Sequence, residues 1–250
     1  MTLNSHKMTL GMTLLLVVTP VSYAQDDNKV ILDGNVHISH DLVDRGLDMS
    51  VRDVSLSATL NLSKGKLFSG VYVSNASNGT WYDAEVSFFA GIDEKLGAWD
   101  LTVMAELDSF HGGDYTIGAT NFEGGSRFFP EVKATIARDY GIAYLVAGTS
   151  WSMRGRFSDA GDSVYAWFDA ELPVPTMPEL TIISHVGYDN KQQTLFSTGK
   201  DAVDWSVGIS AFVQDYELTV SYVNSTDDRF IPNVGNRGKG RVLAGFKFYF

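Results

Sequence analysis

Apolar and polar residues alternate with a period of two along most of this chain, and the 3.6-residue period of an amphipathic helix is not seen. Between residues 54 and 63 every apolar side chain falls on one face, and the same alternation recurs at 97–109, 202–213 and 240–250. Successive side chains of a β-strand point to opposite faces. The pattern therefore predicts strands that each have one apolar and one polar face.

Twelve segments of the chain are predicted to be such strands. They cover residues 30–44, 52–63, 66–75, 81–91, 97–109, 128–139, 141–152, 162–172, 179–189, 202–213, 215–225 and 240–250. Several have about the 9–11 residues that a tilted membrane-spanning strand requires. In the segment 141–152 the pattern does not decide which of two sets of residues faces outward. These sets are Ile142, Tyr144 and Val146 on one side and Ala143, Leu145, Ala147 and Trp151 on the other.

The connections between the predicted strands alternate in length. Those at 63–66, 92–96, 139–141, 173–178 and 213–215 are short, whereas those at 110–127, 189–201 and 225–239 are long and polar. An up-and-down barrel with its amino terminus in the periplasm has short inner turns and long outer loops. A soluble β-sandwich, the alternative, favours shorter strands and no such rule for loops. We therefore expect an all-β fold, a transmembrane antiparallel barrel of about twelve strands formed by residues 25–250.

Residues 1–24 have the features of a cleavable signal peptide. His6 and Lys7 precede a short apolar run at 14–18, and small residues at Ser22 and Ala24 suit a peptidase site after Ala24. Met8 is an alternative start, because the leader is complete from there. We therefore expect export through the periplasm to the outer membrane.

Composition excludes several classes of protein. The chain has no cysteine, which rules out disulfides, thiolate metal sites and a lipid-anchored terminus, and we expect no cofactor. Of its 19 basic residues Lys7 lies in the leader, so against 30 acidic residues the mature part has a formal charge of −12. Such an acidic balance argues against nucleic acid as a partner.

Ionised residues on the polar, inward face suggest the function. The acidic members are Asp33, Asp41, Glu85, Asp100, Glu106, Asp204 and Glu217, and the basic members are Arg45, Lys133, Arg241 and Lys247. A lumen lined mainly by carboxylates favours cations. The hypothesis is a non-enzymatic channel for passive diffusion of small hydrophilic solutes with a modest cation preference, either open and narrow or blocked by the 110–127 loop folding inward. A non-conducting structural or adhesion barrel is the main alternative.

A second alternative is an outer-membrane lipid hydrolase, because His37 and Ser39 share one strand face. Such an enzyme needs this pair on the lipid-facing side. Here Val36, Ile38 and Leu42 share the outward face, which places His37 and Ser39 in the lumen and disfavours the enzyme. His111 and Asp114 lie in an expected outer loop, and two ligands do not make a metal site.

Three stretches resemble the TorF-type porins, a family of Gram-negative outer-membrane proteins. Asp41, Arg45 and Gly46 match the end of the family's first strand, residues 67–75 match its Gly-Val-aromatic-Val-Ser-Asn strand, and 85–91 is similar to the strand that follows. The resemblance covers roughly residues 35–115 and implies an outer-membrane barrel in the lipid bilayer.

The carboxyl terminus resembles the signal by which barrel-assembly machinery recognises its clients. Phe246, Phe248 and the terminal Phe250 fall on the same outward face of the last predicted strand. We therefore expect this machinery to be a partner of the chain.

Overall fold

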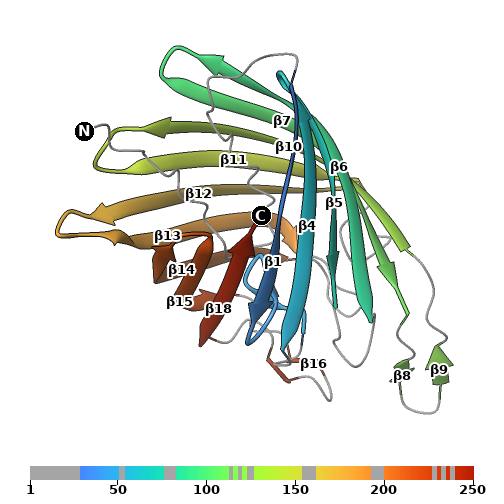
Figure 1. Ribbon diagram of the computed structural model, residues 1–250. Helices are drawn as coiled ribbons and strands as arrows, with labels where there is room; N and C mark the ends of the chain where they lie inside the picture. Colours follow the sequence, from blue (N-terminus) through green and yellow to red (C-terminus); the bar gives the residue numbers. More distant parts are fainter. Residues whose placement is uncertain are drawn as a thin grey trace.

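The computed structural model describes residues 29–50, 54–75, 83–112, 115–117, 120–122, 127–153, 162–192, 200–226, 230–231, 235–236 and 240–250. In these residues twelve strands form a closed barrel (Figure 1). They are β1 (Val30–Ser39), β4 (Ser55–Lys64), β5 (Leu67–Ser74), β6 (Ala84–Leu96), β7 (Trp99–His111), β10 (Arg127–Asp139), β11 (Tyr144–Ser152), β12 (Ser163–Val174), β13 (Met177–Gln192), β14 (Lys200–Val213), β15 (Tyr216–Ser225) and β18 (Arg241–Tyr249).

Each barrel strand pairs antiparallel with its neighbours in chain order, and β1 closes the ring by pairing with both β4 and β18. The described residues also form three two-stranded hairpins: β2 (Val43–Asp44) with β3 (Leu47–Asp48), β8 (Tyr115–Ile117) with β9 (Thr120–Phe122), and β16 (Phe230–Ile231) with β17 (Gly235–Asn236). None of the described segments is a helix of the length and apolarity that crossing a membrane takes. The predicted all-β, twelve-stranded antiparallel barrel is confirmed.

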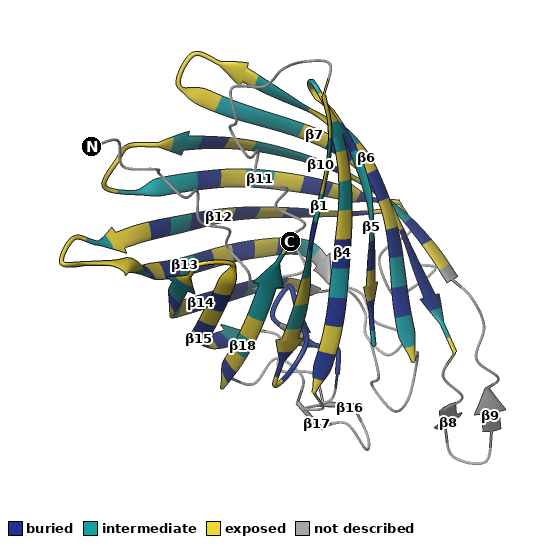
Figure 2. Cartoon of the chain, in the orientation of Figure 1, coloured by how far each residue is buried: buried dark blue, intermediate teal, exposed yellow. Residues whose placement is uncertain are grey.

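The alternation in sequence becomes an apolar outside and a polar inside. From Tyr216 to Val223 of β15 the burial pattern alternates between exposed and buried residues, and Figure 2 shows similar banding on the other strands. Leu218 and Val220 of β15 are more than half exposed, whereas Glu217 is buried. In β11 the structure decides which of the two sets of residues faces outward: Val146 is buried on the inner face, and Trp151 is exposed on the outer face. An exposed apolar belt around a closed barrel is what hydrocarbon requires of a spanning sheet.

The two rims of the barrel differ as predicted. Tight turns follow β4, β6, β10, β12 and β14, and we call this end the short-turn rim. Positive φ angles of 64° at Gly97 and 78° at Gly141 occur in two of these turns, a conformation that glycine adopts without strain. The strand ends that flank the long connections lie at the opposite end, the long-loop rim, and the β8–β9 hairpin lies beyond the ends of β7 and β10 there (Figure 1). The described part of the 110–127 connection therefore does not enter the barrel.

The last residue completes the seam between β1 and β18. The amide of Phe250 donates to the carbonyl of Gly34 at 3.0 Å, and the amide of Gly34 donates back at 3.0 Å. A Cβ at position 34 would lie 2.7 Å from the Phe250 ring, so glycine makes room for this ring on the outer face. Phe246 and Phe250 are exposed on the outer face, where Phe246 stacks on Tyr216 with ring centroids 5.6 Å apart.

One prediction about an apolar side chain is wrong, and one aromatic side chain, Tyr72, is buried inside the barrel. Leu42 was expected on the outward face of a first strand running to residue 44, but β1 ends at Ser39. The chain then turns into the lumen, which removes Leu42 from the lipid-facing side.

Candidate functional site in the barrel lumen

A hairpin of the chain's own backbone lies inside the barrel. We call residues 41–50 the inner hairpin; every side chain that the structure describes in it is buried, including Asp41 at 3 % and Ser50 at 1 % exposure. Arg45 and Gly46 form its tip between β2 and β3, with φ angles of 46° and 74°. Two successive positive φ angles are the geometry of a type I′ turn, which matches the twist of paired strands. The segment is therefore a structured insertion into the lumen.

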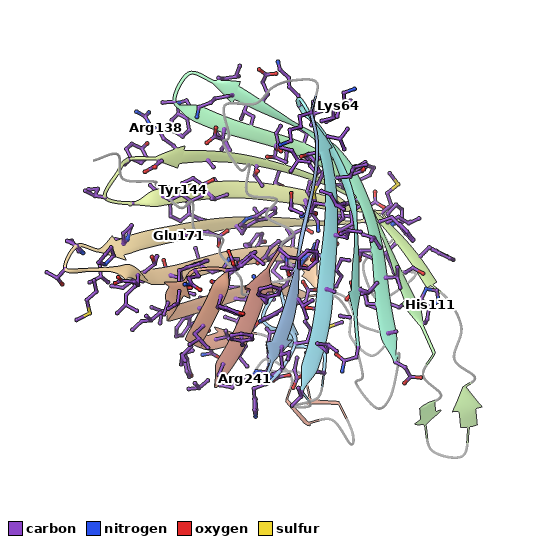
Figure 3. The ribbon with its side chains drawn as sticks, viewed as in Figure 1. Lys64, His111, Arg138, Tyr144, Glu171 and Arg241 are labelled. Carbon is purple, nitrogen blue, oxygen red and sulfur yellow. The ribbon has the colours of Figure 1, made fainter. Side chains whose placement is uncertain are left out.

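The base of the inner hairpin is attached to β18. Arg241 of β18 donates from Nη1 to Asp41 Oδ2 at 3.1 Å and to Asp48 Oδ2 at 2.7 Å. Close by, Val43 packs with Val223 and Leu243 in a small apolar cluster. Arg241 lies toward the long-loop rim (Figure 3).

The tip of the inner hairpin contacts the opposite wall. Arg45 forms an ion pair with Glu131 of β10, donates from Nη2 to Ser150 Oγ of β11 at 3.2 Å, and has Nη1 3.8 Å from Asp189 Oδ2 of β13. Its guanidinium carbon also lies 4.7 Å from the ring centre of Tyr165 on β12. In the ring of twelve strands β10 is six positions from β18. The inner hairpin therefore bridges the barrel from one wall to the other.

The inner hairpin also lies against β14 and β15. A Cβ at Gly46 would be 2.5 Å from the Asp204 Cβ and 2.8 Å from the Ser225 Cβ. Any side chain at position 46 would therefore clash with the wall, in addition to the strain of its positive φ.

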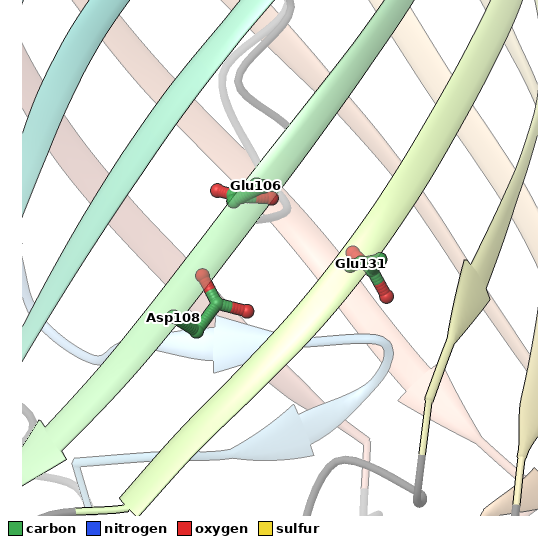
Figure 4. Close-up of side chains that lie close together, drawn as sticks. All are labelled: Glu106, Asp108 and Glu131. Atoms are coloured by element: carbon green, nitrogen blue, oxygen red, sulfur yellow. The ribbon is translucent and has the colours of Figure 1, made fainter.

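A second set of charges lies beside the tip on β7 and β10. Glu106, Asp108 and Glu131 bring carboxylate oxygens within 4.8 Å of one another (Figure 4). Lys133 forms an ion pair with Glu106 and lies 3.0 Å from Glu131 Oε2. The Lys133 ammonium thus neutralises the carboxylates that a metal ion would otherwise bind, and we assign no metal to this group.

The wall beneath Arg45 is held by a buried hydrogen-bond network. The Tyr165 hydroxyl lies 2.8 Å from His185 Nε2, and His185 Nδ1 lies 2.6 Å from Asp169 Oδ1. Asp204 Oδ1 completes the set, 3.0 Å from His185 Nε2. A Cβ at Gly187 would sit 1.9 Å from the Tyr165 hydroxyl, so glycine permits this ring to lie across β13. The ring that faces Arg45 is therefore fixed in position.

The predicted site residues fall into two levels of the lumen. At the level of the inner hairpin lie Asp41, Arg45, Glu85, Glu106, Lys133, Asp204 and Arg241, all of them buried or partly buried. Toward the short-turn rim lie Asp33, Asp100, Glu217 and Lys247. Asp41 and Arg45 were expected on the barrel wall, and this is wrong, because both belong to the inner hairpin. At the short-turn level Asp33, Asp100 and Lys247 are partly exposed, whereas Glu217 is buried.

The residues of the short-turn level are mostly held by neighbours on adjacent strands. Asn61 donates to Asp33 at 2.8 Å, and Tyr249 donates to Glu217 at 2.6 Å. Lys247 lies 3.8 Å from the same Glu217 carboxylate. Tyr144 and Glu171, which pair across β11 and β12, lie in this half too (Figure 3).

Sequence reasoning missed several functional residues of the hairpin level. Glu131 has the same strand parity as Lys133, so alternation alone could have placed it inside. Asp189 was expected to begin an outer loop, although β13 continues to Gln192. No sequence signal indicates that Tyr165 and His185 contact each other, because they lie on different strands.

The structure places the two candidate histidine sites as follows. Ser39 donates its hydroxyl to the backbone carbonyl of Asp41 at 2.7 Å, not to His37, so these two do not form a nucleophile–base pair. His111 Nε2 lies 2.6 Å from Ser109 Oγ, and Asp114 lies outside the described residues.

Docking of the inner hairpin should depend on pH through Asp41. Burial raises the pKa of Asp41 from 3.8 to about 6, with a further increase from Asp48, while Ser50 and Arg241 act in the opposite direction. Because the pKa of Asp41 is higher in the docked hairpin than in the undocked hairpin, protonation of Asp41 favours docking. Docking should therefore be strongest near pH 4 and weaken as pH rises through 6.

The absence of cysteine allows this prediction to be measured by thiol labelling. Met49→Cys places a thiol in the buried hairpin, and His40→Cys supplies an exposed reference that corrects for the pH dependence of the reagent. We expect the ratio of labelling rates, Met49→Cys to His40→Cys, to rise between pH 5 and 7.5. A ratio that does not change, or that falls, would contradict the assignment, and Asp41→Asn should remove the dependence.

Comparisons with known proteins agree with the fold. The structure is similar to the KdgM porin solved in complex with disordered oligogalacturonate, with a TM-score of 0.53 and 7 % identity, over 89 % of this chain and 99 % of that one. It is similar to the COG4313 outer membrane channel from Pseudomonas putida F1, with a TM-score of 0.52 and 15 % identity, over 87 % and 94 % of the two chains. At such identities the likeness concerns the fold alone.

Sequence comparison identifies the family of the chain. A search of curated proteins found no match. The model of the family described as "Bacterial protein of unknown function (Gcw_chp)" matches residues 23–242, which is most of the chain. The TorF-type resemblance is not what this comparison returned and stays a prediction. The chain belongs to the Gcw_chp family of bacterial proteins.

Proposed function

We propose that the protein is an outer-membrane channel for passive diffusion of small hydrophilic solutes, with the inner hairpin as its constriction. The observation that carries the proposal is a twelve-stranded barrel, apolar outside and charged inside, whose lumen accommodates a β-hairpin. Eight-stranded barrels are filled by side chains alone. A lumen that holds additional backbone is wide enough for solutes when that backbone moves.

The attachment of the inner hairpin is suited to movement. Its contacts with the wall include ion pairs at Arg241 and Arg45 and a small apolar cluster around Val43. Water and dissolved ions can replace ion pairs at modest cost, whereas an apolar core resists separation. The contacts therefore favour a constriction that opens over a permanent core.

Location and assembly form part of the same proposal. Residues 1–24 are a signal peptide that directs export, and the outward-facing Phe246, Phe248 and Phe250 are the signal for barrel-assembly machinery. The apolar outer face supports residence in a bilayer, and the two similar structures are described as a porin and an outer membrane channel. We further propose that the protein is not an enzyme.

Ion selectivity tests the channel. Carboxylates that face a confined lumen create a negative potential, which screening limits at high salt. We expect a modest cation preference that grows as salt is lowered, and we expect Glu85→Gln with Glu106→Gln to reduce the permeability ratio by roughly two-fold. The measurement is the reversal potential across a salt gradient in a planar bilayer.

Glu94→Gln is a matched control, because Glu94 lies at the short-turn rim in a partly exposed pair with Lys66. It should leave selectivity unchanged. Anion preference at low salt would contradict the acidic-lumen proposal while leaving the barrel intact.

The second candidate function is a non-conducting structural barrel. One observation favours it: the inner hairpin spans the lumen, and its described side chains are buried. The two candidates differ in whether the hairpin can leave the lumen, and conductance of purified protein distinguishes them.

A further inference from the structure

Arg45 occupies a set of groups that together recognise a guanidinium. We call Glu131, Ser150, Tyr165 and Asp189 the Arg45 site. Nη2 contacts Glu131 and Ser150, Nη1 faces Asp189, and the guanidinium carbon lies 4.7 Å from the Tyr165 ring centre. Two carboxylates, one hydroxyl and an aromatic face match the planar fork and the stacking surface of this cation. A compact ammonium could not make these contacts together.

The Arg45 site belongs to the barrel wall and not to the inner hairpin. Its four residues come from β10, β11, β12 and β13, which are adjacent strands of the ring. Glu131 is also held by Ser152 and Lys133, and Tyr165 is held by His185 and by the space at Gly187. Because these supports lie in the wall, the site keeps its geometry when the hairpin moves.

We infer that the Arg45 site binds solutes that carry a guanidinium group, and that Arg45 is an internal ligand which such a solute displaces. This inference rests on the proposed channel function, for which it names a substrate class. A tethered group competes at an effective concentration in the millimolar range. In wild-type protein a free solute with the same chemistry therefore displaces Arg45 only at roughly tens of millimolar, weak binding that suits a route for passive diffusion.

The test is chemical rescue of a variant with an empty site. In Arg45→Ala protein folded in detergent, methylguanidinium should raise the thermal midpoint at low millimolar concentration, and methylammonium at the same ionic strength should not. Trp167 stacks on Tyr165 with ring centroids 5.6 Å apart, so its fluorescence gives a second readout. Wild-type protein should require at least ten times more methylguanidinium, because Arg45 competes.

Arg241→Ala is the matched control. It breaks the base of the inner hairpin but leaves Arg45 available to the site, so methylguanidinium should act on it as weakly as on wild type. Adding Glu131→Gln to Arg45→Ala should abolish the rescue. If Arg45→Ala does not fold, Arg45→Met retains the aliphatic chain and supports the same measurements. Equal effects of both cations on the empty site, or no effect of either, would overturn the inference.

Bilayer recordings distinguish this inference from the channel proposal. If Arg45→Ala conducts and methylguanidinium reduces its current at millimolar concentration, both are supported. If it conducts but methylguanidinium neither binds nor reduces current, the Arg45 site is wrong and the channel stands. If methylguanidinium binds selectively but neither this variant nor one without the hairpin conducts, the channel is wrong and the binding site stands.

Discussion

Removing the inner hairpin should increase single-channel conductance on the order of ten-fold, because it clears the cross-section that ions must pass. Ser39 of β1 and Ser55 of β4 are Cα partners in the barrel wall. A short Gly-Ser turn can therefore replace residues 40–54 without changing the strand register. The measurement is stepwise conductance of detergent-folded wild-type and hairpin-free protein in planar bilayers at 1 M salt.

The β8–β9 hairpin offers a matched control for loop removal. Its strands lie beyond the barrel wall at the same rim (Figure 1), so shortening residues 115–122 should leave conductance close to wild type. If the variant without the inner hairpin folds but shows no conductance steps, the channel proposal fails. The protein is then a non-conducting barrel.

Deleting Phe250 should lower the amount of assembled barrel in cells at least ten-fold. The deletion removes the amide and carbonyl that pair with Gly34, and it uncovers the outer face where the ring lies. It also removes the terminal aromatic of the proposed assembly signal. Refolding in detergent should suffer less, because the remaining register between β1 and β18 is intact. The measurement is immunoblotting of outer-membrane fractions beside refolding yield.

Val242→Ala tests whether shortening any lipid-facing side chain of β18 lowers assembly as deletion of Phe250 does. Val242 lies on the outer face of the same strand near its beginning, far from the carboxyl terminus, and it is 63 % exposed. We expect near-normal levels for this variant. Normal levels of the protein without Phe250 would show that the terminus has no special role in assembly.

Strand positions and their two faces were predictable because β-structure has a local period. The predicted strand at 162–172 is β12, Ser163–Val174, and its alternation of exposed and buried residues follows the sequence alternation. The order of strands follows from the short turns, since a tight turn can only join antiparallel neighbours. Lumen-facing charges such as Glu106 and Lys133 could be found by parity alone.

The packing of the inward face was less predictable. Phe68 and Phe89 lie on the inward face, where alternation predicts polar residues. A Cβ at Gly91 would be 2.5 Å from the Phe68 ring, and one at Gly70 would be 2.3 Å from the Phe89 ring. These rings lie over glycines of the neighbouring strand, so a cross-strand relation allows them inside. Nothing in the order of residues along one strand shows that relation.

The sequence alone determined that this chain forms a barrel of alternating strands with an apolar outside, because each of these features depends on residues close together in the chain. The location of the inner hairpin inside the lumen follows only from the tertiary structure. Residues 40–44 continue the alternation of β1, and that local signal predicts a longer strand. Arg45 pairs with Glu131, which lies 86 residues later in the chain, and Asp48 pairs with Arg241, which lies 193 residues later. Those partners meet only when the ring has closed, because closure creates the enclosed space in which buried charges must pair.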